Sequence, residues 1–465
     1  MKGVAYDSRR VEPGFAFVAI PGFKRDGTDF APQARLRGAS LVVAERGVPG
    51  APTAVVPDAR YALAALAREA YGDPSGSMEV YGVTGTNGKT TTCYALYAIL
   101  ARAYGEAECG LMTTAETVTA GERLPAVRTT PEAPEVQGTL AAMLAAGVRR
   151  VVMEVSSHGI ALKRVAGTRF AGALFTNLTR DHLDLHGSME DYYSTKRELF
   201  YATEGPRLAN GEDSWGRRLA GEVDGVMTFG GADADYLVAD VKPTRVGTRF
   251  ALRHPGGVLD LETPLLGPYN VLNVAGAASL ALAASVGEGA VGQAAREMEQ
   301  VPGRFERVAT SPGHGFEVIV DYAHTDVGLE AVLGVAKGMV DGRDGGSGRV
   351  VCVFGAAGER DGAKRPKMGR VASRLADLIY VTTDDAYAED PARIAGEVAA
   401  GADASRTWVE LDRRAAIRRA LEGARPGDVV VVAGKGHERV QHLPEGDVPF
   451  HDATVVGELL AEIER

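Results

Sequence analysis

The sequence has little cysteine, no excess of positive charge and no long hydrophobic run. Its 465 residues include only three cysteines, Cys93, Cys109 and Cys352, which cannot form a disulfide framework and make no C-x-x-C pair for zinc or redox chemistry. Lysine and arginine number 51 against 61 aspartates and glutamates, which gives a formal net charge of −10. That balance argues against a protein whose main function is to coat nucleic acid, because phosphate neutralisation needs a cationic surface.

Segments suited to a membrane are also missing from the sequence. The first eight residues include acid and hydroxyl side chains where a signal peptide would have an apolar core. The most apolar long stretch, residues 265–291, is interrupted by Pro268, Asn270 and Asn273, and we predict that it forms a buried, alanine-rich helix. The overall mixture, 45% hydrophobic and 24% charged residues, is that of an ordinary soluble globular protein. We expect a cytoplasmic protein without stable membrane insertion.

Turn-rich segments divide the chain into three predicted domains. At roughly 150 residues per domain, the length predicts about three of them. Residues 72–77 and 301–304, which are rich in glycine, proline and serine, mark two breaks. We therefore predict an N-terminal domain over residues 1–75, a central domain over 76–302 and a C-terminal domain over 303–465.

Short apolar runs alternate with helical patterns in all three predicted domains. Such alternation is typical of a mostly parallel sheet covered by helices on both faces. We predict a small α/β domain at the N-terminus, a mostly parallel sheet in the central domain and a Rossmann-like α/β sheet in the C-terminal domain. The predicted strands lie at residues 15–20, 41–44, 54–56, 79–84, 150–155, 173–176, 318–321, 350–354, 378–381 and 429–433.

A glycine-rich segment follows the predicted strand at 79–84 and leads into a helix predicted over 89–104. Its glycines would let backbone N–H groups approach phosphates, and the helix N-terminus would add positive potential. Lys89 would reach the terminal phosphates, and the Thr90 hydroxyl would bind Mg²⁺. The strict phosphate-loop pattern is not met, because Val83 stands at the first glycine position. The order of strand, loop, lysine, threonine and helix still favours a nucleotide-binding loop over a simple glycine-rich turn.

Acids and histidines follow two further predicted strands. One set comprises Glu154 and the residues after it, and the other comprises Asp181, His182, Asp184 and His186. Because the carboxyl ends of parallel strands meet at one edge of a sheet, these groups could converge on the phosphate loop. Hard oxygen ligands with one imidazole suit Mg²⁺ or Mn²⁺ bridging phosphates. The alternative is a group of polar residues that merely caps the strand ends.

Three of these motifs together resemble the Mur ligase family. They are residues 85–90, residues 154–158 and residues 176–184. The resemblance extends over nearly the whole chain, and the other matches are weak alone but strong in this order and spacing. Those matches are residues 6–9, 269–273, 303–306, 321–325, 358–361, 364–366 and 434–438.

The resemblance implies an ATP-dependent ligase of peptidoglycan synthesis. Its N-terminal domain would bind a uridine nucleotide, its central domain ATP, and its C-terminal domain an amino acid. The reaction would add the third amino acid to UDP-N-acetylmuramoyl-L-alanyl-D-glutamate. The D-glutamyl carboxylate would take the γ-phosphate of ATP, and the incoming amine would attack the acyl phosphate. The family also suggests a monomer whose ligands, spread over three domains, require domain closure.

The resemblance assigns a role to each matching position. Catalysis would involve Lys89, Glu154, His182 and Lys196. Mg²⁺ would be organised by Thr90, Glu154 and His182, with Lys196 as a carbamate. ATP would meet Gly85, Thr86, Asn87, Gly88, Lys89, Thr90, Thr91, Asn273, Arg304, Asp321 and His324. The muramoyl-dipeptide nucleotide would lie along Ser8, Thr129, Thr130, Ser156 and Arg164. The amino acid would meet Arg360, Asp384, Asp385, Tyr387, Gly434 and Glu438.

Lys196 owes its proposed role to the resemblance alone. It matches the family's lysine that reacts with CO₂ to form N6-carboxylysine, an anion that can hold a second metal ion. Judged without that match, it would be an exposed helix lysine.

The third amino acid is predicted from a departure from the family pattern. Members that add meso-diaminopimelate usually carry Asp-Asn-Pro-Arg, whose arginine pairs with the distal carboxylate. Here the segment reads Asp384-Asp385-Ala386-Tyr387, so the bidentate clamp is lost. These aspartates, with Glu438, would suit a side chain that ends in an amine, and Arg360 would remain for the α-carboxylate. We expect lysine or ornithine, with diaminopimelate held in another way as the alternative.

Other functions stay open at this point. A sibling ligase would add a dipeptide to the same precursor or glutamate to folate. Asp7-Ser8-Arg9 favours the muramoyl branch, and residues 183–187 favour the third-residue enzyme. Family members usually have more residues before that Asp-Ser-Arg segment, so the chain starts late or its first domain lacks an edge element. A nucleotide switch without ligase chemistry would leave the C-terminal motifs unexplained.

Overall fold

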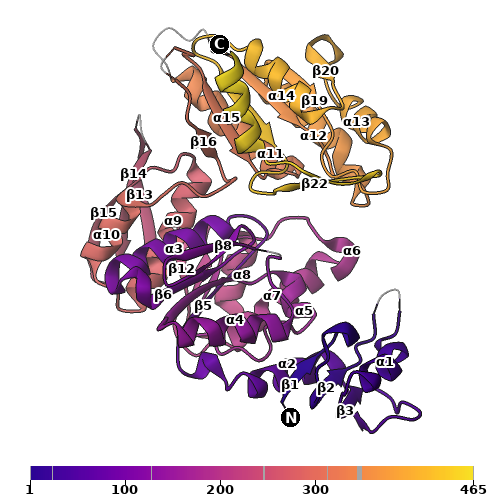
Figure 1. Cartoon of the computed structure of the whole chain (residues 1–465). Coiled ribbons are helices and arrows are strands. Elements are labelled where there is room, and N and C mark those ends of the chain that lie inside the picture. The colour runs from indigo at the N-terminus through magenta and orange to yellow at the C-terminus, as the bar shows by residue number, and fades with distance from the viewer. Residues whose placement is uncertain are drawn as a thin grey trace. The chain divides into compact units, whose positions relative to one another are not determined.

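The computed structural model divides the chain into two units, each built on mostly parallel sheets covered by helices (Figure 1). Unit 1 comprises Met1–Lys242, Arg249–Thr263 and Leu272–Met298, and unit 2 comprises Pro243–Thr248, Pro264–Val271 and Glu299–Arg465. The structure describes residues 2–22, 25–126, 128–244, 247–311, 313–342 and 348–463, except the side chain of Asp184. The mixed α/β fold with parallel sheets that the sequence predicts is confirmed. The predicted three-domain boundaries stay a prediction.

The start of unit 1 is a small parallel sheet with the strand order β1-β2-β3-β4. Alternate residues of its strands face two separate cores, so that Phe17 and Val42 pack on one side and Val18 and Val43 on the other. This alternation is what the pleat of a strand requires when both faces are covered. Its elements are β1 (Gly3–Ala5), β2 (Phe15–Val18), β3 (Leu41–Ala44), β4 (Thr53–Val55), α1 (Ala31–Leu36), α2 (Ala59–Ala70), and the 3-10 helices η1 (Ser8–Arg10), η2 (Gly27–Phe30) and η3 (Pro74–Gly76).

A second sheet of unit 1 carries the predicted phosphate loop. Its strand order is β15-β14-β13-β12-β11-β10-β5-β9-β6-β7-β8. The strands from β12 through β6 pair in parallel, whereas β7 and β8 pair antiparallel. The strands are β5 (Glu79–Thr84), β6 (Cys109–Met112), β7 (Glu116–Thr119), β8 (Glu122–Pro125), β9 (Arg150–Glu154), β10 (Gly172–Phe175), β11 (Arg207–Asn210), β12 (Val226–Gly230), β13 (Tyr236–Pro243), β14 (Thr248–His254) and β15 (Gly257–Thr263).

Helices cover both faces of this sheet. Helix α3 packs on β6 and β9, and α10 packs on α3 and β15.

The predicted single helix over residues 265–291 is wrong, because the stretch forms α9 and the start of α10. Ser285 has φ +65° and Gly287 caps α10, so the helix cannot continue between them. The helices are α3 (Lys89–Tyr104), α4 (Ala133–Ala145), α5 (Ser157–Ala161), α6 (Leu183–His186), α7 (Met189–Tyr201), α8 (Ser214–Glu222), α9 (Pro268–Ala283), α10 (Glu288–Glu297) and η4 (Glu106–Glu108).

Unit 2 is built on a sheet with the strand order β16-β17-β21-β18-β19-β20. Only the edge strand β16 runs antiparallel to its neighbour. Along β21, Val429 and Val431 face the core under α11–α13, whereas Val430 and Val432 face the core under α14 and α15. Both faces are therefore buried, which explains why the strand reads as an unbroken apolar run.

The elements of unit 2 follow one another as alternating strands and helices. They are β16 (Glu306–Val308), β17 (Glu317–Asp321), α11 (Asp326–Asp341), β18 (Val350–Phe354), η5 (Gly362–Lys364), α12 (Arg365–Leu375), β19 (Leu378–Val381), α13 (Pro391–Ala399), η6 (Ala404–Arg406), β20 (Thr407–Val409), α14 (Arg413–Glu422), β21 (Val429–Ala433), the hairpin of β22 (Val440–Leu443) and β23 (Gly446–Pro449), and α15 (Asp452–Ile463).

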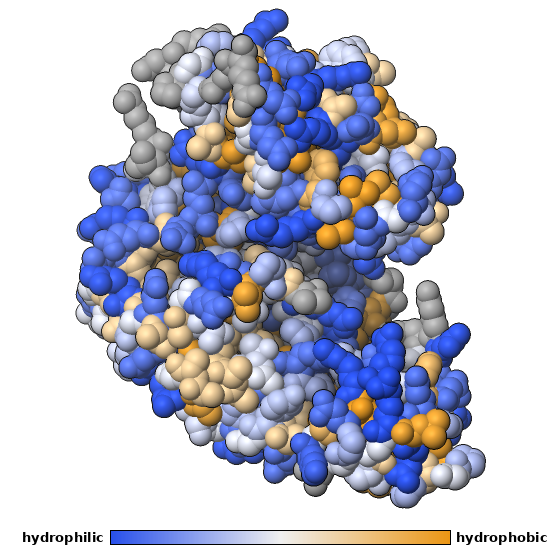
Figure 2. Space-filling view, in the orientation of Figure 1, coloured by the Kyte–Doolittle hydropathy of each residue, from blue (hydrophilic) through white to orange (hydrophobic). Residues whose placement is uncertain are grey.

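Hydrophilic residues predominate on the surface that Figure 2 shows, and hydrophobic residues form small, scattered groups. Within the part of the chain that the structure describes, no helix has both the length and the apolar character needed to span a membrane.

Candidate functional site

The candidate phosphate-binding loop, residues 85–88, connects the buried strand β5 to helix α3. Gly85 has φ +148° and Gly88 has φ +82°, a backbone conformation that other residues rarely adopt. A Cβ at Gly85 would strike the Thr176 hydroxyl, and one at Gly88 would strike the side-chain oxygen of Asn273. Gly88 is the N-cap of α3 and provides no side-chain cap. The loop thus presents bare backbone at a helix N-terminus, an arrangement suited to phosphate groups.

Residues after β10 hold the first half of this loop. The Thr86 amide donates to the carbonyl oxygen of Asn177 at 2.9 Å, and the Asn87 amide donates to Asn177 Oδ1 at 3.0 Å. The Thr176 hydroxyl donates to the Asn87 carbonyl oxygen at 2.6 Å. These bonds hold residues 86 and 87 against the segment that follows β10. Helix α3 begins directly after them.

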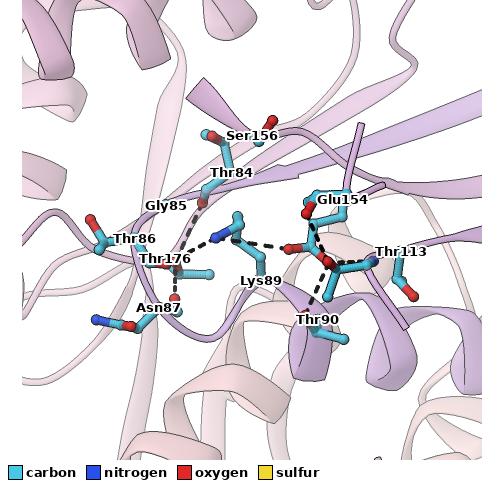
Figure 3. A network of polar contacts seen from close by, with 12 residues as sticks. Thr84, Gly85, Thr86, Asn87, Lys89, Thr90, Thr113, Glu154, Ser156 and Thr176 are labelled. Carbon is cyan, nitrogen blue, oxygen red and sulfur yellow. Dashed lines mark hydrogen bonds and ion pairs between the residues drawn. The ribbon is translucent and has the colours of Figure 1, made fainter. Parts of the chain in front are cut away.

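Glu154, at the end of β9, is the centre of the polar network in Figure 3. Its carboxylate is buried and accepts a hydrogen bond from Thr90 Oγ1 at 3.0 Å and one from the Thr114 amide at 3.2 Å. Lys89 Nζ lies 3.8 Å from Glu154 Oε1 and donates to the carbonyl oxygen of Thr86 at 2.9 Å. The structure therefore brings three predicted site residues together. The contact of Thr114 was not predicted, because only the pairing of β6 with β9 places it here.

Lys196 projects from helix α7 into the same region and is only 1% exposed. Its Nζ donates to the carbonyl oxygen of Gly85 at 2.8 Å and lies 4.7 Å from the ring centre of Tyr192. Burial, together with the nearby charge of Lys89, lowers the pKa of Lys196 well below its ordinary value. The expectation of an exposed helix lysine, drawn without the family resemblance, is therefore wrong.

Histidine rings border the loop on the side of α5 and α6. The His182 ring lies edge-on to that of His158, with centroids 4.7 Å apart, and His186 stacks on Tyr192 at 4.8 Å. Tyr192 in turn places its hydroxyl 3.2 Å from Thr86 Oγ1. His182 has φ +52°, and its ring lies beside the tyrosine that touches the loop. Tyr192 is a site residue that the sequence analysis missed, because a tyrosine in a helix carries no local signal.

Four residues predicted for the muramoyl substrate lie together near the end of β9. Thr130 Oγ1 donates to the Glu154 carbonyl oxygen at 3.0 Å and accepts from the Ser156 amide at 3.0 Å. Arg164 donates to the carbonyl oxygen of Thr130 at 3.0 Å. The Thr129 and Thr114 hydroxyls are 2.7 Å apart, so this polar strip continues directly from the Glu154 network.

The remaining predicted residue for that substrate, Ser8, lies in the small N-terminal sheet region. Its hydroxyl donates to Gln33 Oε1 at 2.7 Å. The same segment contacts helix α4, where Glu135 accepts from the Tyr6 hydroxyl at 3.1 Å and pairs with Arg10 at 2.6 Å.

Residues predicted for the rest of ATP belong to different units. Asn273, in unit 1, lies so close to Gly88 of the loop that a Cβ on this glycine would strike the Asn273 side chain. Asp321, in unit 2, is half-buried, and its carboxylate accepts from the amides of Phe305 at 2.6 Å and Ala323 at 2.8 Å. Burial raises the pKa of Asp321 above its ordinary value.

The other two predicted nucleotide residues of unit 2 both lie against the ring of Tyr322. The Arg304 guanidinium lies 4.2 Å from the ring centre of Tyr322, and the His324 ring lies 4.7 Å from the same ring.

Unit 2 also gathers the charged residues predicted for the amino acid. Carboxylate oxygens of Asp384, Asp385 and Glu438 lie within 4.8 Å of one another. Lys435, fully buried, places Nζ 2.7 Å from Asp385 Oδ1 and 3.0 Å from Glu438 Oε2. Burial alone would lower the pKa of Lys435, but the three carboxylates outweigh it and raise the pKa. The cluster therefore already contains a bound ammonium group, which the sequence analysis did not foresee.

Tyr387 takes the position where the family pattern has arginine. Its backbone has φ +51°, and its ring stacks on His442 with centroids 5.2 Å apart. The Arg360 guanidinium lies 5.9 Å from the Tyr387 ring centre. Gly434 lies against Asp384, because a Cβ there would strike Asp384 Oδ2. All six residues predicted for the amino acid thus lie within the cluster and its immediate neighbours.

Three models of one protein family match the chain. "Mur ligase family, catalytic domain" matches residues 1–71, "Mur ligase middle domain" matches 83–281, and "Mur ligase, glutamate ligase domain" matches 303–436. A protein of Solibacter usitatus named UDP-N-acetylmuramoyl-L-alanyl-D-glutamate--2,6-diaminopimelate ligase is 41% identical over 98% of this chain and 93% of its own length. The chain belongs to the Mur ligase family. This Mur ligase is an ATP-dependent, amide-forming enzyme, as the sequence predicted.

Two further proteins of the same name resemble this Mur ligase over its full length. The Gloeobacter violaceus relative is 42% identical over 99% of this chain and 94% of its own length. A solved structure titled as that ligase matches with a TM-score of 0.70 and 30% identity, over 100% of this chain and 96% of the other.

Proposed function

We propose that this chain joins 2,6-diaminopimelate to UDP-N-acetylmuramoyl-L-alanyl-D-glutamate with hydrolysis of ATP to ADP and phosphate. The observation that carries the proposal is the contact of Lys89 and Thr90 with Glu154 at the start of α3. The relatives and the similar solved structure, which are named as that ligase, support the choice of substrates.

Lys435 is the reason to prefer diaminopimelate over the lysine or ornithine expected from the sequence. That expectation treated the acidic cluster as a site for the terminal amine of a substrate. The Lys435 ammonium already lies against Asp385 and Glu438, so much of this negative charge is neutralised within the protein. Diaminopimelate differs from lysine by a second carboxylate at its distal end, and the ammonium of Lys435 reduces the repulsion that the acidic cluster would exert on that carboxylate. The alternative kept open in the sequence analysis is therefore the better supported one.

Phosphoryl transfer would take place at the phosphate loop. The D-glutamyl carboxylate attacks the γ-phosphorus, the bond to the β-phosphate oxygen breaks, and ADP leaves. Two anions meet in this step, so the main task of the protein is to position them and offset their charge. Lys89 and the first amides of α3 would do so, since both lie at the start of this helix.

Amide formation would follow at the same carboxyl carbon. The free amine of the amino acid attacks the acyl phosphate, the C–O bond to phosphate breaks, and the attacking nitrogen loses a proton. Arg360 and Gly434 would hold the amino acid from unit 2, while Thr129, Thr130, Ser156 and Arg164 would hold the peptide end of the acceptor. Ser8 would contact its uridine end. Asn273, Arg304, Asp321 and His324 would bind the rest of ATP.

The residues around Glu154 fit a magnesium ion. A threonine hydroxyl and a buried carboxylate, 3.0 Å apart for Thr90 Oγ1 and Glu154 Oε2, are the hard oxygen donors that Mg²⁺ prefers. We propose that Thr90, Glu154 and His182 hold it. Bound there, the ion would neutralise charge on the phosphates.

Lys196 fits the proposed carbamate. The amine has to lose its proton before its nitrogen can add to CO₂, and burial lowers its pKa in that direction. Addition converts the neutral amine and CO₂ into a carbamate anion and releases one proton. The carbamate would place a negative charge beside Gly85 and Lys89 and could bind a second metal ion.

The proposal is tested by ADP release from the purified full chain supplied with ATP, Mg²⁺ and the UDP-muramoyl-dipeptide. We expect release that depends on meso-diaminopimelate and is weak with lysine or ornithine. Lys89→Ala should reduce turnover by on the order of a thousandfold or more while preserving the circular dichroism spectrum. Lys163→Ala removes a lysine paired with Glu198 on the surface of the same unit and should leave turnover unchanged.

Three outcomes would each contradict a different part of this proposal. Release with lysine alone would overturn the choice of diaminopimelate but keep the ligase. Release only with folate and glutamate, or with a dipeptide, would assign the chain to a sibling ligase. An active, folded Lys89→Ala variant would remove the phosphate-loop assignment itself.

A further inference from the structure

Arg413 is an unusual residue for its position at the start of helix α14. A cation at a helix N-terminus is opposed by the helix dipole, yet Arg413 is the first residue of α14 and is only 2% exposed. Its guanidinium makes two parallel bonds to Asp452, from Nε to Oδ1 and from Nη2 to Oδ2, each of 2.8 Å. Both side chains are fully buried. A buried ion pair of this kind adds little net stability, because the cost of removing both charges from water offsets their attraction. The position of this pair therefore needs another explanation.

The remaining contacts of Arg413 are with backbone carbonyls at the carboxyl ends of strands. Nη2 donates to the carbonyl oxygen of Ala433 at 3.0 Å, and Nη1 makes a longer contact of 3.5 Å with that of Thr383. Each of these residues immediately precedes a residue predicted to bind the amino acid, namely Gly434 and Asp384. One rigid guanidinium therefore spans two segments that come from β21 and β19, which flank β18 in the sheet.

Little room exists for these two segments to shift. Gly434 has φ +118°, and any side chain there would strike Asp384 Oδ2. Gln441 adds a second link, because its Nε2 donates to the carbonyl oxygens of Thr383 at 3.1 Å and Asp384 at 3.3 Å. The planar fork of arginine has a fixed shape, so the position of Asp452 sets where both carbonyls are held.

We propose that Arg413, oriented by Asp452, is a positioning residue that sets the spacing of Gly434 and Asp384 and thereby the affinity for the incoming amino acid. This inference rests on the proposed amino-acid site of unit 2. Arg413 itself does not touch the substrate. Its effect is confined to the amino acid, because its contacts lie at the ends of β19 and β21 and not at the phosphate loop of unit 1.

The same sheet provides a matched control at the opposite ends of its strands. Arg349 and Asp428 precede β18 and β21, and their side chains pair with Nη2 2.6 Å from Oδ2. Arg349 also donates its backbone amide to Asp428 Oδ1 at 2.7 Å. This pair resembles Arg413–Asp452 in chemistry but lies away from Gly434 and Asp384. Arg349→Lys therefore measures what the loss of a forked ion pair does to the sheet alone.

The first test compares Arg413→Lys with Arg349→Lys in steady-state kinetics. Lysine keeps the charge but cannot hold the carboxylate and two carbonyls at once. We expect the KM for meso-diaminopimelate to rise about tenfold in Arg413→Lys, since small displacements of binding groups have effects of at least this size. The KM values for ATP and the UDP-muramoyl-dipeptide should stay unchanged. In Arg349→Lys all three should remain at the wild-type values.

A second variant separates positioning from stability. Replacing both partners, Arg413→Met with Asp452→Leu, removes the buried charges together, and such replacements are often neutral or stabilising. We expect the thermal midpoint of this variant to stay near that of the wild type while the KM for the amino acid still rises. A rise in KM only in variants that lose thermal stability would overturn the proposal, because the effect would then be structural.

A third measurement does not depend on the ligase reaction. Hydrogen–deuterium exchange of the full chain without substrates should be faster at residues 383–387 and 433–438 in Arg413→Lys and unchanged there in Arg349→Lys. Equal exchange in both variants would overturn the inference even if the wild type proves to be a different ligase. Conversely, faster exchange with no diaminopimelate-dependent ADP release in the wild type would retain the positioning role and reject the proposed substrate.

Discussion

Two buried lysines, one in each unit, have opposite electrostatic surroundings. Lys196 is 1% exposed and Lys435 is 0% exposed, so burial opposes the charged form of both. Lys196 donates to a carbonyl oxygen of the phosphate loop and has the cation Lys89 near it, and its pKa is lowered. Lys435 lies between Asp385 and Glu438, and its pKa is raised.

The comparison shows that burial alone does not decide the charge of a lysine. Burial acts to lower both pKa values, and the neighbouring carboxylates reverse that effect only for Lys435. An amine with a lowered pKa, such as that of Lys196, is the more readily modified of the two, whereas the ammonium of Lys435, with a raised pKa, is a counter-ion inside an acidic cluster. The two lysines thus support different proposals, carbamylation in unit 1 and an already occupied cation position in unit 2.

The largest expected effect is on the free energy of unfolding when the amine of each lysine is removed in turn. Lys435→Met leaves two carboxylates without their counter-ion, and we expect the free energy of unfolding of unit 2 to fall by about 3 kcal/mol. Lys196→Met replaces an amine by an apolar chain of similar length and loses one hydrogen bond, so unit 1 should lose only about 1 kcal/mol. The measurement is urea unfolding of each variant.

Tryptophan fluorescence can assign each loss to its unit. Trp215 lies in α8 of unit 1 and Trp408 in β20 of unit 2, and they are the chain's two tryptophans. Phenylalanine at one of them leaves the other as the reporter of its own unit. Equal losses for both lysine variants would show that the surroundings do not distinguish the two amines.

Carbamylation should distinguish the two lysines, because we expect a carbamate on Lys196 and none on Lys435. With isotopically labelled bicarbonate, NMR of the wild type should show a carbamate carbon that persists in Lys435→Met and disappears in Lys196→Met. The reason is that only the unprotonated amine adds to CO₂. A carbamate that is lost in Lys435→Met instead, or one that survives in Lys196→Met, would contradict the assignment.

The pH dependence of stability gives the smallest effect and has opposite signs for the two lysines. Between the lowered pKa of Lys196 and the unfolded value of 10.5, the unfolded chain binds the extra proton, so its contribution to stability rises with pH. For Lys435, whose folded pKa lies above 10.5, the contribution is complete below 10.5 and is lost as pH rises through the folded pKa. Unfolding of the wild type and of each methionine variant, measured against pH in CO₂-free buffer, checks both signs. A difference between wild type and Lys196→Met that shrinks with rising pH would contradict the first.

Local sequence patterns predicted well the strand and the helix on either side of the candidate phosphate loop. Strand β5, the glycines at 85 and 88, and helix α3 are consecutive in the chain, and each follows from conformational preferences of neighbouring residues. The family resemblance likewise predicted the ATP-dependent ligase, and the comparisons confirm it. The roles of individual site residues stay predictions, although the structure places Lys89, Thr90, Glu154 and Lys196 in one network.

The proposed amino-acid site was harder to predict, because the charge of its acidic cluster depends on a residue whose partners are distant in sequence. Lys435 appears in a recognised motif, yet its pairing with Asp385 spans 50 positions. Read without that pairing, the acids favoured lysine or ornithine, and the relatives instead favour diaminopimelate. The break between α9 and α10 was missed for a simpler reason, since apolar composition alone does not reveal a single residue in a left-handed conformation.

The order of residues along the chain was sufficient to determine the α/β architecture, the helix N-terminus that can receive phosphates and the family to which the enzyme belongs, because each depends on short-range periodicity or on motifs in a fixed order. Tertiary structure alone decided which charges are buried and with which partners they are buried. Folding brings Lys196 to a carbonyl, Lys435 to two carboxylates and Arg413 to Asp452, and the energy of a charge removed from water depends on those neighbours.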